Sequence, residues 1–147
     1  MALLWHNFGR FYFCMKKITF LISCFLLSFL LLPTSLAAQN ETFHPIKEAI
    51  KASNAKEVIK YFNQSVDINL EGAINTHSKV QAEFVLRDFF KKHPLNDFTI
   101  VHTGASKGGL QYAIGKYICA SENFIVTIRI REVGGSFLVN EISFIKE

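Results

Sequence analysis

Side chains that could carry out proton chemistry are scattered between residues 67 and 112 of this chain. We expect His102, Tyr112, Asp67 and His77 to line a pocket, if the fold has one. A base that faces a hydrogen-bond donor can move a proton, and His102 or Asp67 with Tyr112 could supply these two roles. His102 and Asp97 lie five residues apart on one predicted strand, so they point to opposite faces and cannot act as a pair. The residue types permit an acid–base site, but no spacing assigns a catalytic residue.

A glycine-rich stretch raises the question of a phosphate-binding loop, because residues 102–115 read HTGASKGGLQYAIG. A phosphate loop has its lysine directly after the last glycine and is followed by a helix. Here Lys107 precedes Gly108 and Gly109, and the chain continues as a predicted strand. The stretch therefore predicts a hairpin turn with positive φ at the glycines, and Gly115 predicts a bend or a close backbone approach.

Metal and nucleophile chemistry have no signature in the sequence. The chain lacks the H-x-H, H-E-x-x-H and C-x-x-C spacings, so we predict no metal site and no cofactor. Cys119 lies on a predicted strand with no base near it in sequence, which favours a small buried apolar residue.

The first 38 residues have the pattern of a secretory signal peptide. From Met15 a lysine pair leads into an apolar run, Ile18–Leu32, and small residues follow up to Ala37 and Ala38. The run is shorter than the roughly 20 residues of a permanent transmembrane helix. We predict a start at Met15 and an exported protein, periplasmic or extracellular, with no permanent membrane span. A retained anchor and a lipid anchor at Cys24 are the alternatives.

Removal of residues 1–38 changes the charge balance of the chain. Three of the 16 basic residues leave with the leader, so 13 basic residues stand against 12 acidic ones. A nearly neutral domain has no electrostatic motive for binding nucleic acid. Residues 39–147 are predicted to form one domain, in which Cys119 is the only cysteine and no internal disulfide is possible.

The elements that must position the candidate residues form two groups. Helices are predicted in the first group over 43–54, 54–63 and 78–92, with a short strand over 65–72. The third helix begins with a capping box of Ser78 and Gln81. Four strands follow, separated by turn sequences too short for parallel crossovers, so they predict an antiparallel meander. They are predicted over 96–104, 110–120, 123–133 and 136–146.

Helices followed by a long antiparallel sheet define an α+β domain, with the helices across one face of a curved sheet. The strand over 110–120 is apolar on both sides: Tyr112, Ile114 and Ile118 alternate with Ala113, Tyr117 and Cys119. A strand that is apolar on both sides is expected to have both faces covered, and this favours a homodimer that forms through the sheet.

This order of elements resembles the nuclear-transport-factor-2-like superfamily, which includes ketosteroid isomerases, scytalone dehydratase and SnoaL-type polyketide cyclases. Three segments are similar to an uncharacterised group of small secreted bacterial proteins, domain-of-unknown-function family 4783. These segments are QAEFVLRDFFKKHP (81–94), FTIVHTGASKGGLQYAIGKY (98–117) and EISFIKE (141–147). The resemblance covers residues 42–147. It implies a cone-shaped fold with a pocket between the helices and the concave sheet face, and it assigns no catalytic residue because the superfamily contains enzymes and binding modules alike.

The leading hypothesis is an exported, non-catalytic domain that binds a small apolar ligand or a protein partner in the cell envelope. One alternative is a cone-pocket enzyme of the isomerase or dehydratase type that transfers a proton. Another is a structural dimer of the envelope.

Overall fold

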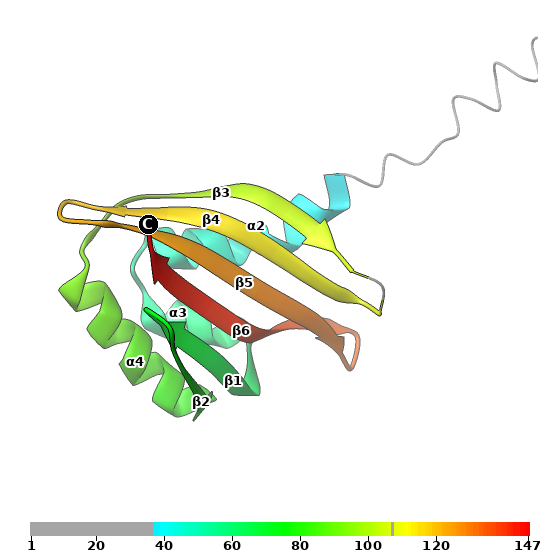
Figure 1. The fold of residues 1–147 in the computed structure, drawn as a ribbon. Coiled ribbons are helices and arrows are strands. Elements are labelled where there is room, and N and C mark those ends of the chain that lie inside the picture. Colours follow the sequence, from blue (N-terminus) through cyan, green and yellow to red (C-terminus); the bar gives the residue numbers. More distant parts are fainter. Residues whose placement is uncertain (1–36, 107) are drawn as a thin grey trace, which may run out of the picture. The chain divides into compact units, whose positions relative to one another are not determined.

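The computed structural model describes residues 37–106 and 108–147. Three α-helices, one 3-10 helix and six strands follow one another in this part of the chain. Their bounds are α2 Ala37–Lys51, α3 Ala55–Val58, η1 Ile59–Tyr61, β1 Phe62–Leu70, β2 Ala73–Ser78, α4 Lys79–Lys92, β3 Leu95–Ala105, β4 Leu110–Cys119, β5 Asn123–Val133 and β6 Ser136–Lys146. The strands form a single sheet in the order β2-β1-β6-β5-β4-β3, and the helices lie against one face of it (Figure 1).

The α+β architecture predicted from the sequence is confirmed, including the four-stranded meander. Strands β3 to β6 are consecutive antiparallel neighbours. The turn between β3 and β4 has Gly108 and Gly109 at φ 103° and 78°, as the hairpin interpretation of the glycine-rich stretch requires. The predicted leader, residues 1–38, lies almost wholly outside the described residues.

Two of the predicted helices begin at the caps that the sequence indicates. The side chain of Asn54 accepts a hydrogen bond from the Glu57 backbone N–H at the start of α3. At α4, Ser78 and Gln81 form the reciprocal capping box. The cap fixes the first turn of α4 and therefore decides which of its side chains face the sheet.

Strand β2 was not predicted from the sequence. Its six residues are almost all exposed, because β2 is an edge strand that pairs only with β1. A strand without a buried face has no apolar alternation to reveal it. Strand β1 in turn pairs in parallel with β6, so the sheet is mixed and β6 lies near its centre.

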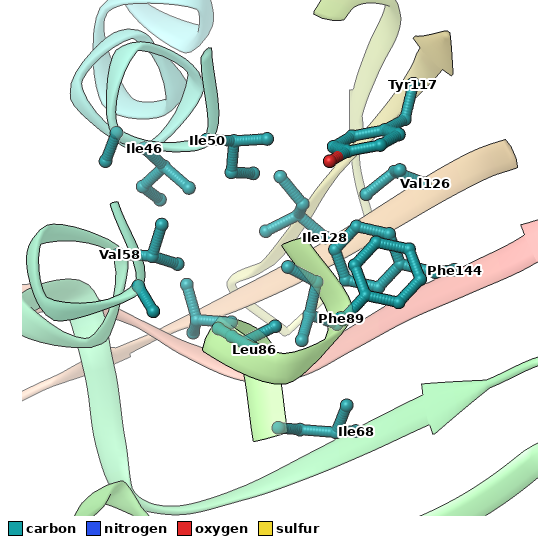
Figure 2. Close-up of a cluster of buried hydrophobic side chains, with 14 of the residues drawn as sticks. Ile46, Ile50, Val58, Ile68, Leu86, Phe89, Tyr117, Val126, Ile128 and Phe144 are labelled. Carbon is teal, nitrogen blue, oxygen red and sulfur yellow. The ribbon is translucent and has the colours of Figure 1, made fainter. Parts of the chain in front are cut away.

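The core fills the space between the helices and the sheet. Ile46 and Ile50 of α2, Val58 of α3, and Leu86 and Phe89 of α4 pack toward the sheet (Figure 2). The sheet contributes its inward-facing residues to the same cluster, among them Ile68, Tyr117, Val126, Ile128 and Phe144. The apolar positions predicted from helix and strand periodicity therefore meet in one continuous core.

The two sides of β4 differ as the alternation predicts. Ala113, Tyr117 and Cys119 are buried against the helices. Tyr112 and Ile114 are half-buried on the opposite, outer face, and Ile118 there is 38% exposed. The outer face thus retains apolar side chains that no helix covers.

Candidate functional site

A groove of about 540 Å³ lies between the C-terminal half of α4 and the end of β1. Leu70, Val85 and Phe89 supply its apolar surface. Four ionisable residues complete the lining: Glu71, Asp88, Lys92 and His93. A groove with an apolar floor and charged margins can hold a small molecule or a side chain that has one apolar and one polar end.

Helix α4 forms one wall of the groove through its periodicity. Val85, Phe89 and His93 are spaced four residues apart and therefore lie along one side of the helix. His93 is the residue that ends the helix, and its backbone N–H donates to the carbonyl oxygen of Phe89 over 2.9 Å. The opposite wall comes from the turn after β1, where the Glu71 N–H donates to the Phe144 carbonyl of β6, also over 2.9 Å.

The floor of the groove is rigid because Phe89 is packed among other rings. Its ring centroid lies 4.3 Å from that of Phe144, 5.3 Å from Phe124 and 5.6 Å from Tyr117. Behind these rings, the hydroxyl of Tyr117 donates a 2.7 Å hydrogen bond to the backbone carbonyl of His93. Burial raises the pKa of this phenol well above its ordinary value. The rings occupy the interior directly beneath the groove, so the groove is shallow and does not continue into the core.

A network of charges borders the groove at the end of α4. Nδ1 of His93 lies 2.7 Å from Oε1 of Glu122, which belongs to the turn between β4 and β5. The other carboxylate oxygen of Glu122 contacts the ammonium group of Lys146 on β6. The hydrogen bond from Lys146 lowers the pKa of Glu122, and the same contact raises the pKa of Lys146. Glu122 is therefore held in its carboxylate form.

The structure brings His102 and Tyr112 together, but on the outer face of the sheet. Nε2 of His102 lies 3.4 Å from the Tyr112 hydroxyl, and the two rings are 5.8 Å apart. Tyr112 also covers Gly104, where an added Cβ would come within 2.6 Å of its ring. Neither His102 nor Tyr112 is among the residues that line the groove.

Asp67 and His77 are placed apart from this pair. Asp67 on β1 accepts a 2.6 Å hydrogen bond from the Thr76 hydroxyl of β2 and lies opposite Glu141 of β6. The same Glu141 forms a 2.7 Å ion pair with Arg129. His77 is half-buried on the edge strand β2, and neither it nor Asp67 lines the groove.

Sequence reasoning missed the residues that surround the groove. Glu71, His93 and Glu122 are far apart in the chain and share no motif, so only the fold brings them together. One available signal was the four-residue spacing of Val85, Phe89 and His93, which continues the apolar stripe of α4 to a polar residue at its end.

Helices that cover one face of a curved, mixed sheet, with a C-terminal meander, define the nuclear-transport-factor-2-like class of proteins. A family model for a domain of unknown function, DUF4783, matches residues 43–144. This match spans more than half of the chain, so the protein belongs to the DUF4783 family. The description of the family assigns it no function.

Solved structures agree with this assignment. A DUF4783 protein from Bacteroides uniformis is 26% identical, with a TM-score of 0.67; the match covers 71% of this chain and 95% of that one. A second, from Bacteroides ovatus, is 23% identical with a TM-score of 0.67 and coverages of 70% and 93%. An NTF2-like protein of unknown function from Shewanella baltica is 15% identical, with a TM-score of 0.60 and coverages of 79% and 98%. The second and third similarities, each below 25% identity, show the fold alone.

No protein with a curated description matches this chain. Within the described residues, no helix combines the length and the apolar character that crossing a membrane requires.

Proposed function

We propose that this protein is an exported, non-catalytic binding domain of the cell envelope that holds a small apolar ligand in the α4 groove. The observation that carries the proposal is the groove itself, with Leu70, Val85 and Phe89 at its floor and charged side chains at its margin. Its volume of about 540 Å³ falls within the range of roughly 300–1,000 Å³ that is usual for small-molecule sites.

The packing of the interior supports a ligand at the surface over one deep in the cone. Phe89, Phe90, Tyr117, Phe124 and Phe144 are all buried, with neighbouring ring centroids 4.3–6.3 Å apart. A ligand in that space would have to displace aromatic side chains, each of which contributes several kcal/mol to stability, about 3–5 for a phenylalanine. The groove offers apolar contact without this cost.

Proton-transfer catalysis has less support. His102 and Tyr112 lie on the sheet face that the helices leave uncovered, where water competes for their hydrogen bonds. A base and an oxyanion donor act strongly only where water is excluded.

The experiment is a thermal-shift titration of the purified protein with dodecanoate, an apolar chain with one charged end. We expect a concentration-dependent rise in Tm for the wild type and its loss in Val85→Trp, which fills the groove. Val80→Trp is the matched control, because Val80 lies on the same helix but is 65% exposed and does not line the groove. An unchanged Tm in the wild type, or equal shifts in both variants, would refute ligand binding in the groove.

Fractionation of cells, with the mass of the mature chain, tests export and cleavage after Ala37 or Ala38.

The apolar outer sheet face favours a second role, a homodimer that pairs these faces. Ile118 on β4 and Ile145 on β6 are 38% and 39% exposed there, and Ile125 of β5 lies directly opposite Ile145. Light scattering is expected to give a dimer mass for the wild type and a monomer mass for Ile118→Glu with Ile145→Glu. Val80→Glu, at an exposed position of α4 on the other side of the sheet, is the control that keeps the dimer. A monomer mass for the wild type at high concentration would exclude this dimer.

A further inference from the structure

We propose that Glu71, His93 and Glu122 bind a divalent transition-metal ion such as Zn²⁺. The three residues come from three separate segments: the turn after β1, the end of α4 and the turn between β4 and β5. One ligand atom from each, a histidine nitrogen or a carboxylate oxygen, lies within 4.8 Å of the other two. Imidazole and carboxylate groups are common ligands of Zn²⁺ in proteins.

The distances are compatible with one ion after small side-chain movements. Metal–ligand bonds of about 2.0–2.2 Å in a tetrahedral site place neighbouring donor atoms roughly 3.4 Å apart. His93 Nδ1 and Glu122 Oε1 are closer than this, at 2.7 Å, and the full set extends to 4.8 Å. Glu71 is exposed, so its side chain is free to close the larger gap by rotation.

The backbone of each ligand residue is already held by the fold. The Glu71 N–H donates to the Phe144 carbonyl, and the His93 N–H donates to that of Phe89, each over 2.9 Å. The Glu122 carbonyl accepts a 3.0 Å hydrogen bond from the Cys119 N–H across the hairpin. An ion that meets pre-positioned ligands binds with a smaller loss of conformational entropy.

The imidazole of His93 is held in place by neighbouring rings. It packs against Phe89 and Phe124, whose centroids lie 4.7 and 4.8 Å away. Nδ1 is buried and faces Oε1 of Glu122 over 2.7 Å. A metal ion placed between them would take one ligand atom from each residue.

Lys146 does not block the site, although its ammonium group contacts one of the ligand residues. It contacts Oε2 of Glu122, whereas Oε1 is the oxygen that faces His93. A lysine on the far oxygen orients the carboxylate in the way that neighbouring hydrogen-bonding groups orient metal ligands. Its side chain is 59% exposed, so it can move toward solvent when an ion arrives.

The test is calorimetric titration of chelator-treated, full-length protein with ZnCl₂, with MgCl₂ as a control for nonspecific attraction. We expect one Zn²⁺ per chain, no comparable binding of Mg²⁺, and visible absorption of Co²⁺ bound in its place. Glu71→Gln and Glu122→Gln should each weaken Zn²⁺ binding by about tenfold or more, as should His93→Gln. Because Glu71 is exposed, Glu71→Gln leaves the core intact and keeps the test valid if the other variants unfold.

Two control variants separate this site from other sources of binding. Glu147→Gln and His44→Asn change an exposed glutamate and an exposed histidine elsewhere, and both should bind Zn²⁺ as the wild type does. Zn²⁺ binding by calorimetry and the rise in Tm with dodecanoate are measured separately on the wild type, so the two proposals can fail independently. Absence of one-to-one Zn²⁺ binding, or equal affinity in Glu71→Gln and the wild type, would overturn the metal site.

Discussion

The hydroxyl of Tyr117 donates a 2.7 Å hydrogen bond to the backbone carbonyl of His93, across 24 positions of sequence. This bond ties the end of α4 to strand β4. It also fixes the backbone of a residue that borders the groove and belongs to the proposed metal site. The buried core and the candidate site therefore share one structural element.

Tyr117→Phe is expected to lower the free energy of unfolding by about 1 kcal/mol, because the partly buried His93 carbonyl loses its donor. Urea denaturation measures the change. Tyr112→Phe is the control: its hydroxyl lies on the outer face and 3.4 Å from His102, so the loss should stay within about 0.5 kcal/mol. Equal effects of the two substitutions would contradict the importance of the bond to His93.

Stability should fall at alkaline pH because of Tyr117. Burial raises the pKa of its phenol, so the folded protein keeps the proton while the unfolded chain ionises near its ordinary value of about 10. Above that pH the unfolded state binds fewer protons than the folded state, and each further pH unit costs up to about 1.4 kcal/mol. Denaturation curves between about pH 9 and 11 should show this loss, and Tyr117→Phe should show a smaller slope. Identical slopes would disprove the assignment.

The thiol of Cys119 should react slowly in the folded protein. Cys119 is 6% exposed. Burial raises the pKa of its thiol, and the negative charge of Glu122 raises it further. In a variant with Cys14 and Cys24 replaced by serine, iodoacetamide at about pH 8 should modify Cys119 roughly tenfold or more slowly than in urea. Mass spectrometry follows the reaction. Similar rates with and without urea would mean that the thiol is accessible.

Gly115→Ala should destabilise the protein through contact with Phe98. An added Cβ would lie 2.7 Å from the ring of Phe98, which is fully buried and has no open space to enter. Overpacking of this kind costs about 1–3 kcal/mol. In a double-mutant cycle, Phe98→Leu should relieve part of the cost, and the coupling energy measures the clash. Additive effects of the two substitutions would argue against it.

Much of the fold was predictable because local signals and burial agree. The capping box at Ser78, the stripe of α4 and the turn glycines each fix an element independently of the rest of the chain. Strand β2 was not predictable, because nearly all of its residues are exposed. Its sequence therefore lacks the alternation of apolar and polar residues that a strand with one buried face shows. The parallel pairing of β1 with β6 joins distant segments and has no local signature.

The candidate site could be predicted far less well. Alternation from the buried Phe98 places His102 on the face that the helices cover, but a β-bulge between Ile100 and His102 turns His102 to the outer face, where it meets Tyr112. The groove depends on where α4 ends relative to two turns that are distant in sequence. Glu71 and Glu122 belong to those turns, and their proximity to His93 is a property of tertiary structure alone.

The central position of β6 has a consequence for how the domain is made. Ile68 of β1 lies opposite Ile142 of β6, a separation of 74 positions, so the β1–β2 hairpin can join the rest of the sheet only when strand β6 is present. Contacts between such distant residues form slowly, because a long loop must close first. A ribosome will therefore have synthesised nearly all of residues 62–146 before the six-stranded sheet can be completed.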